Sequence, residues 1–118
     1  MPRARVQAEA FDAGIEIAAL GEGRRDVGAV ATFIGYVRDR NDGTGVSRMT
    51  LEHYPGMTER ALEDICDEAL GRWDLLALRV VHRVGVLEPG DPIVLVAVSS
   101  AHRGDAFAAC EFVMDYLK

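Results

Sequence analysis

Apolar positions along the chain recur with a helical period in three segments. Residues 57–73 and 103–118 each place their apolar side chains on one stripe, which is typical of helices packed against a core. Thr58 is the expected N-cap of the first of these helices. A shorter helix is predicted after Asp12, its expected N-cap, and Gly21 and Gly23 are expected to end it at Leu20.

Other segments have strand character. Residues 28–38 are rich in β-branched and aromatic side chains, and residues 48–54 alternate, so the two are predicted to form a hairpin across a turn at 39–45. Strands are also predicted at 3–9, as an edge strand, at 75–84, and at 93–99, whose continuous apolar run indicates burial on both faces. The order β-α-β-β-α-β-β-α predicts an α+β fold, a mainly antiparallel sheet with helices packed on it.

Composition narrows the possible classes of protein. At 118 residues, with 49% hydrophobic and 27% charged side chains, the chain is expected to form a single domain over residues 1–118. Its longest uncharged apolar run is about half of the roughly 20 residues that span a membrane, and no signal-peptide pattern is visible, so a cytoplasmic location is expected. The net charge of -6 argues against nonspecific binding to nucleic acid or membranes, and an anionic ligand would need a local basic cluster.

One such cluster is Ser-Ser-Ala-His-Arg at 99–103, where an apolar strand gives way to the last helix. The free N–H groups and positive dipole end of a helix N-terminus favour an anion, and His102 and Arg103 would add donors and charge. This arrangement suits a phosphate or a carboxylate. The alternative is that Ser99 or Ser100 only caps the helix while His102 and Arg103 are solvated.

Two further cations are weaker candidates. Arg38 ends a strand at the mouth of a loop, where an arginine can bind phosphate through two hydrogen bonds, although it could equally be a solvated residue and Arg40 is an equal rival. Lys118 ends the last helix, where a lysine usually complements the negative end of the helix dipole. A catalytic lysine would instead place a cation beside developing negative charge.

Cysteine and histidine positions give little sign of metal or redox chemistry. Cys66 and Cys110 form no Cys-x-x-Cys pair and lie on the apolar stripes of predicted helices, so both are expected to be core residues rather than persulfide carriers. His53, His82 and His102 lie on separate predicted elements without the short spacing of a metal motif. No metal site is predicted.

Six segments together resemble the large, catalytic subunit of molybdopterin synthase, over roughly residues 28–118. They read Phe-Ile-Gly-Tyr-Val-Arg at 33–38, Leu-Glu-His-Tyr-Pro-Gly-Met at 51–57, Val-His-Arg-Val-Gly at 81–85, Glu-Pro-Gly-Asp at 88–91, Ser-Ser-Ala-His-Arg at 99–103 and Met-Asp-Tyr-Leu-Lys at 114–118. The resemblance implies a hammerhead-like fold and a cytoplasmic sulfurtransferase of molybdenum cofactor biosynthesis. Its substrate would be cyclic pyranopterin monophosphate, and its sulfur donor the C-terminal Gly-Gly thiocarboxylate of a small ubiquitin-like subunit.

The resemblance also implies roles for individual residues. Arg38, His102 and Arg103 would hold the anionic substrate, and Lys118 would be the catalytic lysine. Phe33 and Met114 would line the pocket, with core packing as the alternative for both. The resemblance implies no cofactor.

Helix geometry then predicts a shared site. If Arg103 opens the last helix and Lys118 ends it, their backbones lie roughly 22 Å apart, which is too far to converge on one pterin. A symmetric homodimer would bring His102 and Arg103 of one copy beside Arg38 and Lys118 of the other, and with two small subunits the assembly would be a heterotetramer. The family's last helix continues into a segment with a second functional lysine, which this chain is expected to lack. The alternatives are a non-catalytic anion-binding or small-molecule-binding module and a subunit of the synthase that serves only in assembly.

Overall fold

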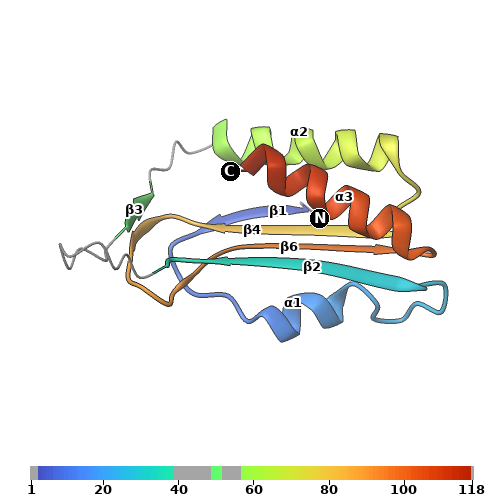
Figure 1. The fold of residues 1–118 in the computed structure, drawn as a ribbon, viewed down its shortest axis with the longest axis horizontal. Coiled ribbons are helices and arrows are strands. Elements are labelled where there is room, and N and C mark those ends of the chain that lie inside the picture. Colours follow the sequence, from blue (N-terminus) through green and yellow to red (C-terminus); the bar gives the residue numbers. More distant parts are fainter. Residues whose placement is uncertain (1–2, 39–48, 52–56, 118) are drawn as a thin grey trace.

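The computed structural model describes residues 3–38, 49–51 and 57–117. A four-stranded sheet carries helices α2 and α3 on one face and helix α1 on the other (Figure 1). The elements are β1 (Ala4–Gln7), α1 (Ala13–Ala19), β2 (Ala29–Tyr36), β3 (Met49–Leu51), α2 (Met57–Arg72), β4 (Ala77–Arg83), β5 (Gly85–Leu87), β6 (Pro92–Ser100) and α3 (Arg103–Leu117).

The sheet has the order β1-β4-β6-β2, and β6 pairs antiparallel with both of its neighbours. Only β1 and β4 pair in parallel among the described strands. The prediction of an α+β fold with a mainly antiparallel sheet is therefore confirmed. So is the edge position of the first strand.

Two local predictions were wrong, and one strand was not predicted. The strand at 28–38 does not pair with the next strand, because β2 pairs along its length with β6, whereas β3 pairs with β5 in a separate two-stranded sheet. Strand β5 itself was not predicted. It begins at Gly85, whose φ of 94° turns the chain away from β4. Helix α2 begins at Met57, so Thr58 lies inside the first turn and is not the N-cap.

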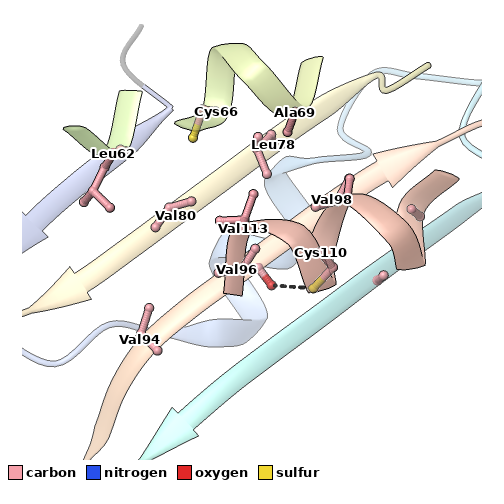
Figure 2. Close-up of a cluster of buried hydrophobic side chains, with 14 residues drawn as sticks. Leu62, Cys66, Ala69, Leu78, Val80, Val94, Val96, Val98, Cys110 and Val113 are labelled. Carbon is pink, nitrogen blue, oxygen red and sulfur yellow. Dashed lines mark hydrogen bonds between the residues drawn. The ribbon is translucent and has the colours of Figure 1, made fainter. Parts of the chain in front are cut away.

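Strand β6 is buried on both faces, as its apolar sequence predicts. From Val94 to Ser100 every residue is buried. Alternate side chains on one face enter the core beneath α2 and α3, where Figure 2 shows Val96 and Val98 facing Val113 and Cys110 of α3. Because β6 also pairs on both edges, it fixes the positions of the strands and helices around it.

Helix α1 is held on the opposite face mainly by polar contacts. None of its residues is buried. Its Glu16 carboxylate lies 2.8 Å from Arg5 of β1 and 3.6 Å from Arg79 of β4. The predicted Asp12 N-cap is confirmed, since its carboxylate accepts a hydrogen bond from the Ile15 N–H. These contacts connect α1 to the sheet without a large apolar interface.

Adjacent residues on β5 offer a matched test of the core. Leu87 is fully buried and Val86 is 58% exposed. Leu87→Ala should lower the free energy of unfolding by about 2 to 5 kcal/mol, because it removes transfer energy and leaves a cavity. Val86→Ala should change it by less than about 0.5 kcal/mol. The free energy of unfolding of each variant is measured by urea denaturation. Equal decreases in the two variants would contradict this assignment of the two faces.

Candidate functional site

The strongest predicted cluster lies on a two-residue turn. Strand β6 ends at Ser100 and α3 begins at Arg103, so only Ala101 and His102 join them. The His102 carbonyl accepts a hydrogen bond from the Ala106 N–H, which makes His102 the N-cap of α3. His102 and Arg103 are both exposed at this positive helix end. The turn therefore presents an imidazole, a guanidinium and free backbone N–H groups to solvent.

Ser100 supports this turn from inside the protein. Its side chain is fully buried. The hydroxyl donates to the Asp74 carbonyl at 2.7 Å and accepts from the His102 N–H at 3.2 Å. An N-cap serine would instead accept from an N–H two or three residues into the helix. Ser100 thus holds the residue before the helix rather than capping the helix itself.

Gly28 closes the other side of the turn, and it was not among the predicted site residues. Its N–H donates to the Ser100 carbonyl at 2.9 Å. A Cβ at this position would overlap with the Ala101 carbonyl oxygen. Only glycine therefore fits here without moving the turn. The available signal was a glycine immediately before a strand of β-branched residues, which can mark a close backbone approach.

Arg38 lies at the other end of the sheet. Strand β2 ends at Tyr36, and the Val37 N–H and carbonyl bond to Asp91 and Gly90, beside the start of β6. Arg38 follows and is exposed. The rival Arg40 and the catalytic candidate Lys118 lie outside the described residues.

A pocket of about 400 Å³ lies between β2 and α3. Phe33 and Met114 both line it, and Phe33 is 43% exposed. Met114 also packs against the core. The rest of the lining is Ala31, Thr32, Phe107, Cys110, Glu111 and Asp115. The lining thus combines apolar side chains with two carboxyl groups.

The structure brings some of the predicted residues together and separates others. Phe33 and Met114 share the pocket. Strand β2 runs antiparallel to β6 and its first residue, Ala29, pairs with Ser100. The nine residue steps from Ala29 to Arg38 therefore place Arg38 roughly 30 Å from the turn that carries His102. Helix α3 returns along β6, so its C-terminal end lies toward the end of the sheet at which β2 finishes (Figure 1). One protomer therefore does not bring Arg38 and Arg103 to a common ligand.

Neither cysteine is placed for nucleophilic or persulfide chemistry. Cys66 is fully buried, and burial, with a smaller effect of Glu63, raises the pKa of its thiol to about 11. Burial also raises the pKa of Cys110, whose Sγ lies 4.0 Å from the Val96 carbonyl oxygen. The expectation that both are core residues is confirmed. Among the described residues, no group of three or more His, Cys, Asp or Glu side chains could hold a metal ion.

Comparisons with known proteins agree with one another. A profile of the family described as MoaE protein matches residues 6–118. A molybdopterin synthase catalytic subunit from Ralstonia nicotianae is 68% identical over 118 residues, covering 100% of this chain and 67% of the relative. Another from Pseudomonas aeruginosa is 60% identical over 114 residues, covering 97% and 76%.

The comparison with solved structures points to the same family. The solved structure of a molybdopterin biosynthesis MoaE protein from Burkholderia ambifaria superposes with a TM-score of 0.90 at 54% identity, covering 100% of this chain and 77% of that one. Within the described part of the chain, no helix is long and apolar enough to cross a membrane.

The raised thiol pKa values predict slow alkylation of the folded protein. At pH 8 the fraction of Cys66 present as thiolate should be roughly a hundredfold lower than in the unfolded chain, because its pKa is about 11 instead of 9.0. Labelling with iodoacetamide, followed by mass spectrometry, should therefore be fast in urea and very slow in buffer. It should accelerate as the pH rises toward 11. Rapid labelling of either cysteine in the folded protein at pH 8 would show that the thiols are accessible and ionised.

Proposed function

We propose, because this chain belongs to the MoaE family, that it transfers sulfur to the pterin precursor of the molybdenum cofactor. Relatives that are 50 to 68% identical to it are molybdopterin synthase catalytic subunits, so it is classed as an enzyme of molybdenum cofactor biosynthesis. The proposed substrate is cyclic pyranopterin monophosphate. The proposed donor is the C-terminal thiocarboxylate of a small ubiquitin-like subunit.

The observation that carries the substrate assignment is the exposed turn at the start of α3. His102 and Arg103 stand beside free backbone N–H groups at a helix N-terminus, an arrangement that favours a phosphate monoester. The chain is acidic overall, so local positive charge of this kind is needed for an anionic ligand. Arg38 would contact the substrate from a second direction, and Lys118 would place a cation beside the charge that develops during transfer.

The pocket between β2 and α3 is the proposed position for the end of the donor subunit. Phe33 and Met114 provide apolar contacts on either side of it. A Gly-Gly terminus has no side chains, so it can approach a backbone and enter a narrow groove that larger residues could not. The two sulfur transfers would each consume one thiocarboxylate and leave the donor with a carboxylate.

Two copies of the chain would complete each site. His102 and Arg103 lie at one end of β6, and Arg38 at the other. A two-fold axis can place the first end of one copy against the second end of its partner and produce two equivalent sites. Strand β2 is an edge strand with exposed Phe33 and Tyr36, features that are common where chains associate. With two small subunits the proposed assembly is a heterotetramer, and two reduced cysteines suit the proposed cytoplasmic location.

Removal of the last two glycines of the small subunit tests the groove. Titration by isothermal calorimetry should show weaker binding of the shortened partner than of the intact one, since the apolar and backbone contacts of its end are lost. The control is the intact partner, which keeps the two glycines and has the same surface contacts. Undiminished affinity of the shortened partner would argue against insertion of its end.

Mixing two inactive variants tests the shared site. Arg103→Ala and Lys118→Ala chains, both extended by the family's lysine-bearing C-terminal segment, are mixed and refolded so that mixed dimers form. Each mixed dimer should contain one site with both residues intact, so sulfur transfer should recover to roughly a quarter of wild type when half of all dimers are mixed and each has one of two sites.

The control for this experiment is each variant refolded alone, which should remain inactive. Native mass spectrometry with one variant isotopically labelled verifies that mixed dimers are present. No recovery in verified mixed dimers would show that Arg103 and Lys118 act within one protomer or that Arg103 does not act at the site.

A further inference from the structure

The buried hydroxyl of Ser100 connects the segment after α2 to the turn that presents His102 and Arg103. We propose that Ser100 is a positioning residue, which fixes the backbone of this turn so that His102 and Arg103 face the phosphate group of the substrate. The inference rests on the proposed function, since it assigns Ser100 to the anion-binding part of that site. Nothing in the resemblance gave Ser100 this role.

The hydrogen-bond directions leave the hydroxyl no freedom. A serine hydroxyl has one proton and two lone pairs. The proton is committed to the Asp74 carbonyl at 2.7 Å, which leaves a lone pair to accept the His102 N–H at 3.2 Å. Ser100 is fully buried, so water cannot readily replace it in either bond. Loss of the hydroxyl would leave both the Asp74 carbonyl and the His102 N–H without this partner.

The turn depends on the hydrogen bond from the His102 N–H to Ser100, because the turn's own side chains do not hold it in place. In the described structure, neither the His102 imidazole nor the Arg103 guanidinium makes a hydrogen bond or an ion pair with another residue. Their directions are therefore determined by the backbone on which they stand. That backbone has only two residues between β6 and α3, and Gly28 blocks its movement toward β2. Ser100 is the remaining contact that holds the His102 amide.

The neighbouring serine provides a matched control. Ser99 is also fully buried on β6, but its hydroxyl has no partner in the described structure. Consecutive side chains of a strand point to opposite faces, so Ser99 points away from the face on which Ser100 bonds to Asp74. Ser99→Ala removes the same atoms from the same strand. It leaves the support of the turn unchanged.

Steady-state kinetics of sulfur transfer separate positioning from general stability. Ser100→Ala should raise the KM for cyclic pyranopterin monophosphate roughly three- to tenfold, with kcat changed by less than about twofold. Ser99→Ala should leave both constants within about twofold of wild type. The Arg103→Ala background is expected to be inactive, so the readout there is the Kd for cyclic pyranopterin monophosphate, measured by calorimetry. The effect of Ser100→Ala on this Kd should fall below about twofold in the Arg103→Ala background, because the contact that Ser100 positions is already absent. An undiminished effect in that background would overturn the proposal.

A second pair of variants covers the case in which Ser100→Ala does not fold. Ser100→Thr and Ser100→Val have the same shape and differ in the hydroxyl, so only the valine variant should show the raised KM. Equal KM values for the two would overturn the proposal.

Amide hydrogen exchange provides a readout that does not depend on catalysis. Exchange at the His102 amide should be faster in Ser100→Ala, or in Ser100→Val, than in wild type and in Ser99→Ala. If wild type transfers no sulfur when given the thiocarboxylated partner, the proposed function fails, and exchange still shows whether Ser100 holds the turn. Unchanged exchange at His102 would overturn the role of Ser100 whatever the activity of the enzyme.

Discussion

Burial of β6 on both faces and both edges is the constraint on which the rest of the structure depends. Seven consecutive residues, from Val94 to Ser100, are removed from water. Their apolar side chains pack beneath α2 and α3 on one face and are also buried on the other, and their N–H and carbonyl groups pair with β2 and β4. A strand held in this way cannot slide or tilt without losing contacts on every side. Both of its ends are therefore fixed points, and the candidate site residues are attached to them.

The length of β6 and α3 separates these residues into two groups. His102 and Arg103 follow the last residue of β6, whereas Arg38 lies beside its first residues. Because α3 returns along the sheet, the same separation applies along the helix, whose fifteen residues span about 21 Å. A rigid element of that length prevents one protomer from closing around a small ligand. The proposal of a site completed by a second copy follows from this rigidity.

The surface between β2 and α3 differs from the core beneath it because it exposes aromatic side chains and carboxyl groups. Phe33 and Phe107 are exposed beside an edge strand, and the pocket between them is partly lined by carboxyl groups. Large exposed aromatic side chains next to an unpaired strand edge are unusual unless another molecule covers them. Cys110 is among the lining residues of the same pocket, and burial raises the pKa of its thiol. In the proposed reaction the sulfur accordingly comes from the partner and not from this chain.

The sequence by itself determined the features that depend on neighbouring residues in the chain. Helical periodicity located α2 and α3, the apolar run identified β6 as buried on both faces, and the Asp12 side chain marked the start of α1, because each of these signals acts within a few residues. The six motifs identified the family. Tertiary structure alone decided which strands pair, since β2 bonds to a strand more than fifty positions away and β3 to β5. It alone also revealed Gly28 and Ser100 as supports of the turn, because a close backbone approach and a buried hydrogen bond arise only when distant segments meet.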